Sequence, residues 1–143
     1  MGPRRTWREK LQTGREPKIV RMLIPGSADL EELLRSIPKG KLITDGQIKE
    51  WLKKKYAVDA VCAKVLGIRL RIIAEAAEEE IAEGKSEEEV IPYWRVVKKD
   101  GGLYPNFPGG VEKQAFRLEK EGHVILRGRK IRVKDFERHL VDI

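Results

Sequence analysis

The sequence predicts a mainly helical domain of the winged helix-turn-helix type, with a small β-hairpin as its wing. Three observations support this fold class. Apolar residues recur at helical spacing in three successive segments between residues 27 and 83, and a tight turn joins the second segment to the third. A fourth helical pattern follows at residues 111–120. Two short apolar runs near the C-terminus flank an Arg-Gly-Arg turn, which is typical of a hairpin.

Length and charge narrow the class of protein. The chain has 143 residues, enough for one domain with a substantial core. Hydrophobic residues make up 41% and charged residues 37%, which excludes an intrinsically disordered chain. The formal net charge of +7 indicates a polyanionic partner, most commonly a nucleic acid. The alternative interpretation is an ordinary soluble protein with a basic surface.

The absence of certain sequence patterns indicates where the protein is located and which cofactors it can bind. No apolar run approaches the roughly 18 residues of a membrane-spanning helix, and no apolar stretch follows the basic N-terminus as in a secretory signal. The single cysteine, Cys62, fits a reducing cytoplasm. Cys62, His123 and His139 lie too far apart in sequence to show metal-ligand spacing. We therefore expect a cytoplasmic protein with no metal or other cofactor and no membrane contact.

Residues 1–26 are expected to form a basic N-terminal arm. This segment holds seven Arg and Lys residues against Glu9 and Glu16. It ends in an extended apolar stretch, residues 19–24, before a Pro-Gly turn. The charge suits either an arm that contacts phosphates or a solvated terminus.

The first three helices are expected to begin at capping residues. Ser27 or Asp29 can cap the first helix, and Asp59 can cap the third. Thr44 begins the second helix, where Gln47 three residues later completes a capping-box pattern. The buried face of the first helix is predicted to consist of Leu30, Leu33, Leu34 and Ile37.

The third helix is long and carries two neighbouring apolar stripes. One stripe consists of Val61, Val65, Ile68 and Ile72, and the other of Leu66, Leu70, Ile73 and Ala77. The sequence then turns acidic at residues 78–80 and 87–89. Because runs of carboxylates are usually solvated and repel DNA, we expect both runs to lie away from any nucleic-acid groove.

The C-terminal third combines a glycine-rich loop, a helix and the hairpin. The loop spans residues 98–110, and Phe116 is expected in the core face of the helix at 111–120. The hairpin and a last helical turn fill residues 123–143, where His123 and His139 are expected at the surface. Six Arg and Lys residues between 127 and 138 suffice for phosphate contacts if that face is turned toward DNA. We expect the hairpin to belong to the same domain as residues 27–122.

Several motifs occur in the order found in one known family. They are the stretches 37–44 (IPKGKLIT), 63–67 (AKVLG), 91–97 (IPYWRVV), 100–102 (DGG), 107–110 (FPGG) and 118–122 (LEKEG). On these motifs, residues 28–122 resemble the DNA-binding domain of the O6-alkylguanine-DNA alkyltransferases. The likeness is greatest to the alkyltransferase-like branch, which keeps the fold but lacks the acceptor cysteine.

The reactive positions of that family are replaced here. The resemblance puts Tyr93 at the acceptor cysteine, Trp94 at the general-base histidine and Glu121 at the orienting glutamate. A phenol with an ordinary pKa near 10 and no base beside it is a poor alkyl acceptor at neutral pH. The resemblance therefore implies a protein that does not transfer alkyl groups and is not an enzyme.

The resemblance also implies the surroundings of the site. The family's phosphate-rotating tyrosine falls at Asp45 and its arginine finger at Lys64. The residues expected at the DNA are Thr44, Asp45, Lys64 and Arg69. Those expected around the base pocket are Tyr93, Trp94, Arg95, Asn106, Phe107 and Glu121, with Arg95 bridging loop carbonyls.

The function implied is a monomeric, non-enzymatic protein that binds double-stranded DNA, recognises alkylated guanine and assists repair with a partner protein. Tyr93 and Trp94 either form a stacking wall for an extruded base or fill the former pocket as core residues. The alternatives are a plain winged-helix nucleic-acid binder with a filled pocket, a residual methyltransferase that uses Cys62, and a protein-interaction module.

Overall fold

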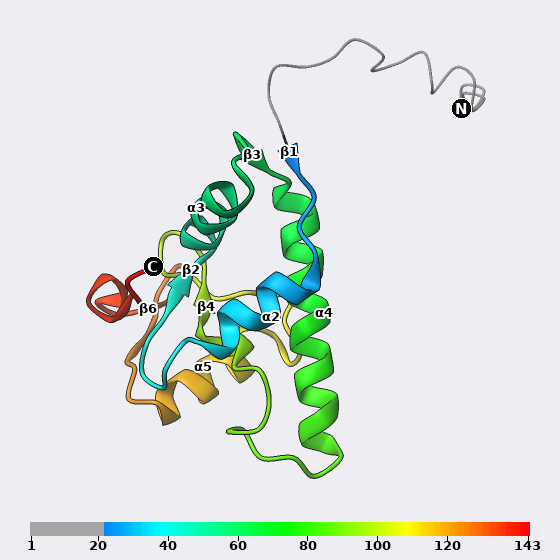
Figure 1. Cartoon of the computed structure of the whole chain (residues 1–143). Coiled ribbons are helices and arrows are strands. Elements are labelled where there is room, and N and C mark those ends of the chain that lie inside the picture. Colours follow the sequence, from blue (N-terminus) through cyan, green and yellow to red (C-terminus); the bar gives the residue numbers. More distant parts are fainter. Residues whose placement is uncertain (1–21) are drawn as a thin grey trace, which may run out of the picture.

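The computed structural model describes residues 22–143, so most of the basic arm lies outside the described residues. Figure 1 shows the helices and strands in chain order. They are β1 (Met22–Leu23), α2 (Ser27–Arg35), β2 (Ile43–Thr44), α3 (Asp45–Tyr56), β3 (Ala60–Val61), α4 (Ala63–Ala82), η1 (Tyr93–Arg95), β4 (Val96–Val97), α5 (Gly110–Lys120), β5 (Ile125–Arg127), β6 (Ile131–Val133) and η2 (Phe136–His139). The predicted fold class, mainly helical with a small hairpin, is confirmed.

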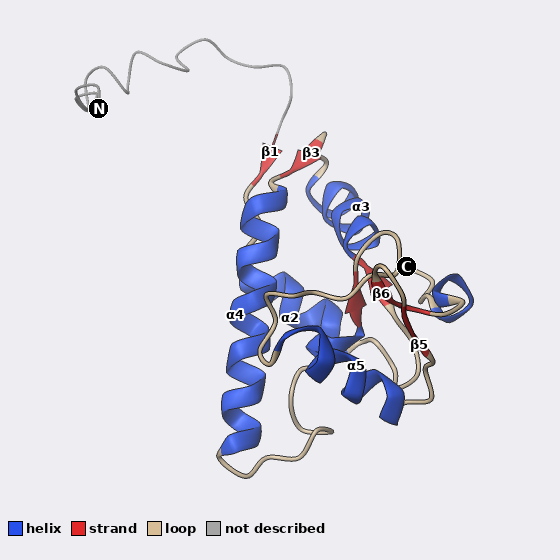
Figure 2. Cartoon of the chain, turned by 180° about the vertical axis from the view of Figure 1, so that it is seen from behind, coloured by secondary structure: helices blue, strands red, loops and turns tan. Residues whose placement is uncertain are grey.

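Helices supply most of the structure, and short strands tie them together. The long helix α4 borders one side of the molecule and the β5–β6 hairpin borders the other (Figures 1 and 2). β2 pairs in parallel with β4, so the start of α3 lies beside the segment that follows η1. β1 pairs in parallel with β3 and anchors the first described residues beside the start of α4. These pairings fix the chain just before α3 and just before α4, the two helices of the helix-turn-helix.

Only one of the three expected helix caps forms. Thr44 caps α3 in a complete capping box with Gln47. The caps expected at Ser27 or Asp29 and at Asp59 are wrong, because Gly26 and Cys62 are the N-caps and neither caps with its side chain. Pairing with β1 keeps residues 60 and 61 extended, so α4 cannot begin directly after Asp59.

The core takes only one of the two apolar stripes of α4. Leu66, Leu70, Ile73 and Ala77 are buried, and α2 packs against α4. Ile68 and Ile72 of the other stripe are 47% and 51% exposed, because no described element covers them. Phe116 is also exposed, since α5 is rotated so that Gln114, Ala115, Arg117 and Leu118 face inward.

The C-terminal segment closes the domain against the start of α3. The Leu42 N–H donates to the His139 carbonyl (2.8 Å), and the Val141 N–H donates back to the Leu42 carbonyl (2.9 Å). The Gln47 amide donates to the Val141 carbonyl (2.8 Å). The surface position expected for His123 is wrong: this residue is buried, and its ring lies edge-on to His139. No helix within residues 22–143 is long and apolar enough to span a membrane.

Candidate nucleic-acid interface

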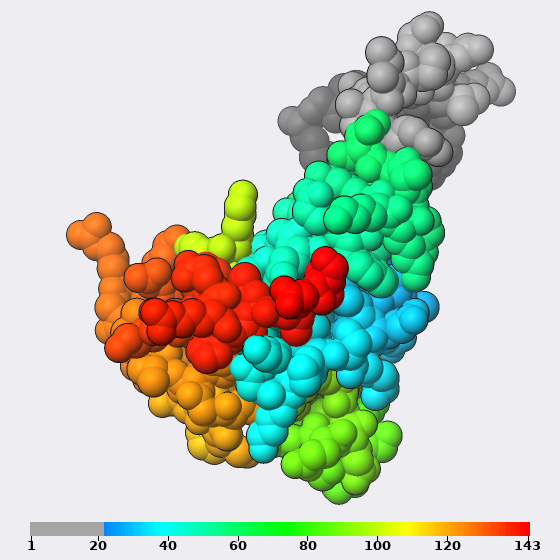
Figure 3. All heavy atoms as spheres, turned by 60° about the vertical axis from the view of Figure 1, so that its left-hand side comes forward, coloured from blue at the N-terminus to red at the C-terminus, as the bar shows by residue number. Residues whose placement is uncertain are grey.

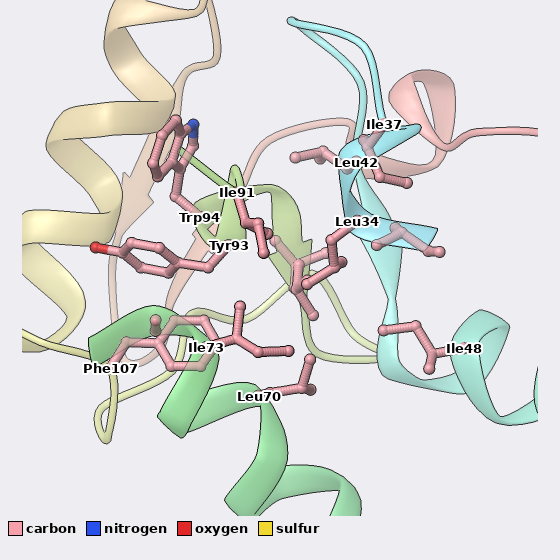
Figure 4. Packing of buried hydrophobic residues seen from close by; sticks show 14 of the residues in the cluster. Leu34, Ile37, Leu42, Ile48, Leu70, Ile73, Ile91, Tyr93, Trp94 and Phe107 are labelled. Carbon is pink, nitrogen blue, oxygen red and sulfur yellow. The ribbon is translucent and has the colours of Figure 1, made fainter. Parts of the chain in front are cut away.

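Tyr93 and Trp94, at the positions expected to hold the reactive pair, are core residues. Both side chains are 1% exposed. They lie in η1, and Figure 4 shows them packed among the buried apolar side chains, near Ile73 and Phe107. The Tyr93 ring meets Trp94 edge-on at 5.2 Å between centroids and Phe107 at 5.3 Å. We call Tyr93, Trp94 and Phe107 the aromatic cluster.

A buried ion pair holds the Tyr93 hydroxyl. The phenol donates to Glu78 of α4, which also accepts from Arg117 Nε (2.8 Å) and Nη2 (2.7 Å) of α5. Lys113 Nζ lies 3.1 Å from the same carboxylate. Burial raises the pKa of Glu78, but these bonds outweigh it and hold that pKa below its ordinary value. Burial and the Glu78 charge raise the pKa of Tyr93 far above neutral, so the phenol stays protonated.

The sequence did not identify Glu78 as part of this site. As a member of the acidic run 78–80 it was expected in solvent, whereas its side chain is only 10% exposed. Glu87 of the second run also turns inward, toward Arg117 and Lys120. Basic residues on α5 provide partners for both carboxylates, which a periodicity argument on α4 alone cannot anticipate.

The Glu121 carboxylate accepts hydrogen bonds from several groups of the protein itself. It accepts from Trp94 Nε1 (2.7 Å) and from the Gly40 N–H (3.2 Å). Arg95 Nε donates to Oε1 and Arg95 Nη2 donates to Oε2, both at 2.9 Å. Arg95 Nη1 donates to the Ile37 carbonyl (2.6 Å), the kind of carbonyl contact expected for it. Burial raises the pKa of Glu121, but these donors outweigh it and hold the pKa below its ordinary value.

The remaining two residues expected around the pocket, Asn106 and Phe107, lie in different environments. Phe107 is 4% exposed and stacks on Tyr104 at 4.5 Å, so it continues the aromatic cluster toward the surface. Asn106 is exposed. The Tyr93 ring fills the interior beside Phe107, at 5.3 Å between ring centroids.

The four residues expected at the DNA lie at the starts of α3 and α4. Thr44 is buried and its hydroxyl serves the capping box. Lys64 is exposed in the first turn of α4, and Arg69, one turn further, is half-buried with no described partner for Nε. Asp45 opens α3, and its Oδ1 is buried without a hydrogen-bond partner among residues 22–143.

A recess of about 370 Å³ separates Asp45 from the turn after β4. It is lined by Asp45, Lys98, Lys99, Asp100 and Tyr104. Lys98 and Lys99 are exposed there, and Lys98 Nζ lies 5.7 Å from the centre of the Tyr104 ring. Exposed amines beside a helix-turn-helix can neutralise backbone phosphates, so this edge is the candidate nucleic-acid interface.

Within residues 22–143, the Cys62 thiol lies far from the aromatic cluster, and no metal centre is found there. Cys62 precedes α4, whereas Tyr93 bonds to Glu78, sixteen residues later and about 24 Å along the helix. Within residues 22–143, no group of three or more His, Cys, Asp and Glu side chains is arranged to hold a metal ion.

Comparison with known proteins gives one family and one solved structure. The family model described as 6-O-methylguanine DNA methyltransferase, DNA binding domain, matches residues 27–123. The fold is similar to the crystal structure of S. pombe Atl1 in complex with damaged DNA containing O6-carboxymethylguanine, with a TM-score of 0.55 and 18% identity. That likeness covers 82% of this chain and 94% of Atl1. A search of curated proteins finds no match.

Proposed function

Because this chain belongs to the family of 6-O-methylguanine DNA methyltransferase DNA-binding domains, we propose that it binds double-stranded DNA and transfers no alkyl group. The proposed absence of alkyl transfer rests on the state of Tyr93. Its side chain is buried, its hydroxyl is bonded to a carboxylate, and its pKa is raised. A protonated phenol directed at Glu78 is not an available nucleophile.

The proposed DNA surface runs from the helix-turn-helix to the turn after β4. Lys64 lies at the start of α4, and Lys98 and Lys99 flank the recess beside α3. The net charge of +7 adds long-range attraction to DNA. Thr44 supports this surface indirectly, because its cap fixes the first turn of α3.

The proposal is tested by fluorescence anisotropy with a labelled duplex and by intact mass. Binding should weaken steeply as salt rises, since each phosphate contact releases condensed counterions. The protein's mass should not change after incubation with a duplex that contains O6-methylguanine. A gain of one methyl group, retained by a Tyr93→Phe variant but lost in a Cys62→Ser variant, would instead identify Cys62 as an acceptor.

Recognition of alkylated guanine is a second candidate. It is favoured by the likeness to Atl1, whose crystal structure holds damaged DNA. In this chain a base could enter the family pocket only if Tyr93 left the core, which breaks its bond to Glu78 and exposes its ring. Equal affinity for O6-methylguanine and unmodified duplexes would reject this candidate and leave DNA binding intact.

A further inference from the structure

Within the described residues 22–143, the C-terminal hairpin β5–β6 is a basic feature that the proposed function leaves unused. It begins after residue 123, where the match to the family model ends. Residues 125–134 contain five Arg and Lys residues and no acidic residue.

The hairpin is joined rigidly to the turn that follows β4. The Val133 N–H donates to the Gly101 carbonyl (3.0 Å), and the Leu103 N–H donates to the Ile131 carbonyl (3.2 Å). Lys130 Nζ bonds Asp100 Oδ2 at 2.8 Å. The hairpin therefore cannot move independently of the Lys98–Lys99 turn that borders the candidate interface.

The basic side chains lie on the outward face of this joint. Val133 is buried and Ile131 half-buried, whereas Arg132 between them is exposed, as strand alternation requires. A hollow of about 500 Å³ is lined by Asp100, Leu126, Gly128, Arg129, Lys130 and Arg132. Asp100 also lines the recess that holds Lys98 and Lys99, so the two hollows meet at this residue. Figure 3 shows the hairpin in orange beside the yellow-green turn, with α3 beyond it.

Two guanidinium groups on this face have no charged partner. Neither Arg129 nor Arg132 forms an ion pair within residues 22–143, whereas Arg127 on the same hairpin pairs with Glu112 (3.2 Å) and Glu119 (3.0 Å). Lys130 is paired with Asp100. Arg129 and Arg132 thus place two uncommitted guanidinium charges on the same side of the turn as the exposed Lys98 and Lys99.

We propose that the hairpin is a second binding site for the phosphodiester backbone of DNA, which extends the contact surface beyond the helix-turn-helix. The inference rests on the proposed binding of double-stranded DNA. Arg129 and Arg132 each neutralise a phosphate of the duplex that α3 and α4 hold. The paired Arg127 stabilises the hairpin and makes no such contact.

The test compares the salt dependence of binding among variants. Anisotropy with a 24-base-pair duplex between 50 and 200 mM salt gives the slope of log K against log salt. That slope is negative, and in the variant with both Arg129→Ala and Arg132→Ala it should be less steep by about 1.8, from roughly 0.9 for each lost contact. The affinity ratio between the two salt concentrations then shrinks about 12-fold. Arg127→Ala removes the same charge as either single variant and should leave the slope unchanged.

Each result decides between the proposals. If the double variant keeps the wild-type slope, or if Arg127→Ala makes the slope less steep by as much as Arg129→Ala, the hairpin site is refuted while DNA binding stands. If the wild-type protein does not bind duplex DNA at 50 mM salt, both proposals fail. Equal thermal melting of the double variant, Arg127→Ala and wild type establishes that any change in slope comes from lost contacts and not from unfolding.

Discussion

Replacing Glu78 by glutamine should be among the most damaging single changes to the stability of this protein. The variant keeps the side-chain volume and an acceptor for the Tyr93 hydroxyl but removes the charge that Arg117 contacts through two bonds of 2.8 and 2.7 Å. The Glu78 and Arg117 side chains are only 10% and 7% exposed. Breaking such a buried pair costs about 3–5 kcal/mol, and we expect the lower end because Arg117 keeps Glu87 as a partner.

Urea denaturation at pH 7 measures this loss directly. About 3 kcal/mol corresponds to a melting temperature lower by about 10 °C for a domain of this size. Glu50→Gln is the matched control, because Glu50 pairs with Lys53 at 3.0 Å on an exposed surface and should cost under about 0.5 kcal/mol. A loss below about 1 kcal/mol for Glu78→Gln, with an unchanged denaturant slope, would refute the idea that the ion pair is desolvated.

Three further predictions concern pH, a helix cap and backbone conformation. Burial and His139 lower the pKa of His123 below its ordinary value of 6.5. The free energy of unfolding should therefore fall as the pH drops below 6.5, because the unfolded chain then binds a proton that the folded protein does not. In His123→Gln, the urea midpoint should change less between pH 7 and pH 5 than in the wild type. Thr44→Ala should cost about 1 kcal/mol in urea unfolding, and Thr44→Ser should restore most of it. Gly101→Ala should lower the melting temperature, since φ is +84° and a Cβ would lie 2.5 Å from the Phe136 ring. Gly67→Ala, inside α4 with open space around it, should raise that temperature, so equal effects of the two glycine variants would contradict this account.

Local patterns predicted the elements and the family well. The Thr44–Gln47 capping box, the order of the helices and the hairpin all follow from short-range sequence preferences, and the family motifs lie within the matched residues 27–123. These features depend on residues a few positions apart, so they need no knowledge of the tertiary structure.

Errors arose where a distant segment decides the outcome. Two apolar stripes on α4 are equivalent in sequence, and the packing of α2 and η1 against this helix leaves Leu70 buried and Ile72 exposed. The buried His123 ring meets His139 edge-on, a residue 16 positions away, and the buried Glu78 pairs with Arg117, which lies 39 residues away. Whether Tyr93 lines or fills a pocket was likewise undecidable, because the carboxylate that holds its hydroxyl comes from another helix.

The bonds that join residues 139–141 to the start of α3 bear on how the protein is made. Gln47 meets its acceptor, the Val141 carbonyl, across a separation of 94 residues. Until those late residues leave the ribosome, the Leu42 peptide groups and the Gln47 amide lack their partners. Contacts so distant in sequence form slowly, because the long intervening chain must first be ordered. A nascent chain can therefore build the helices of its DNA-binding unit early, but it finishes that unit only after synthesis has passed residue 141.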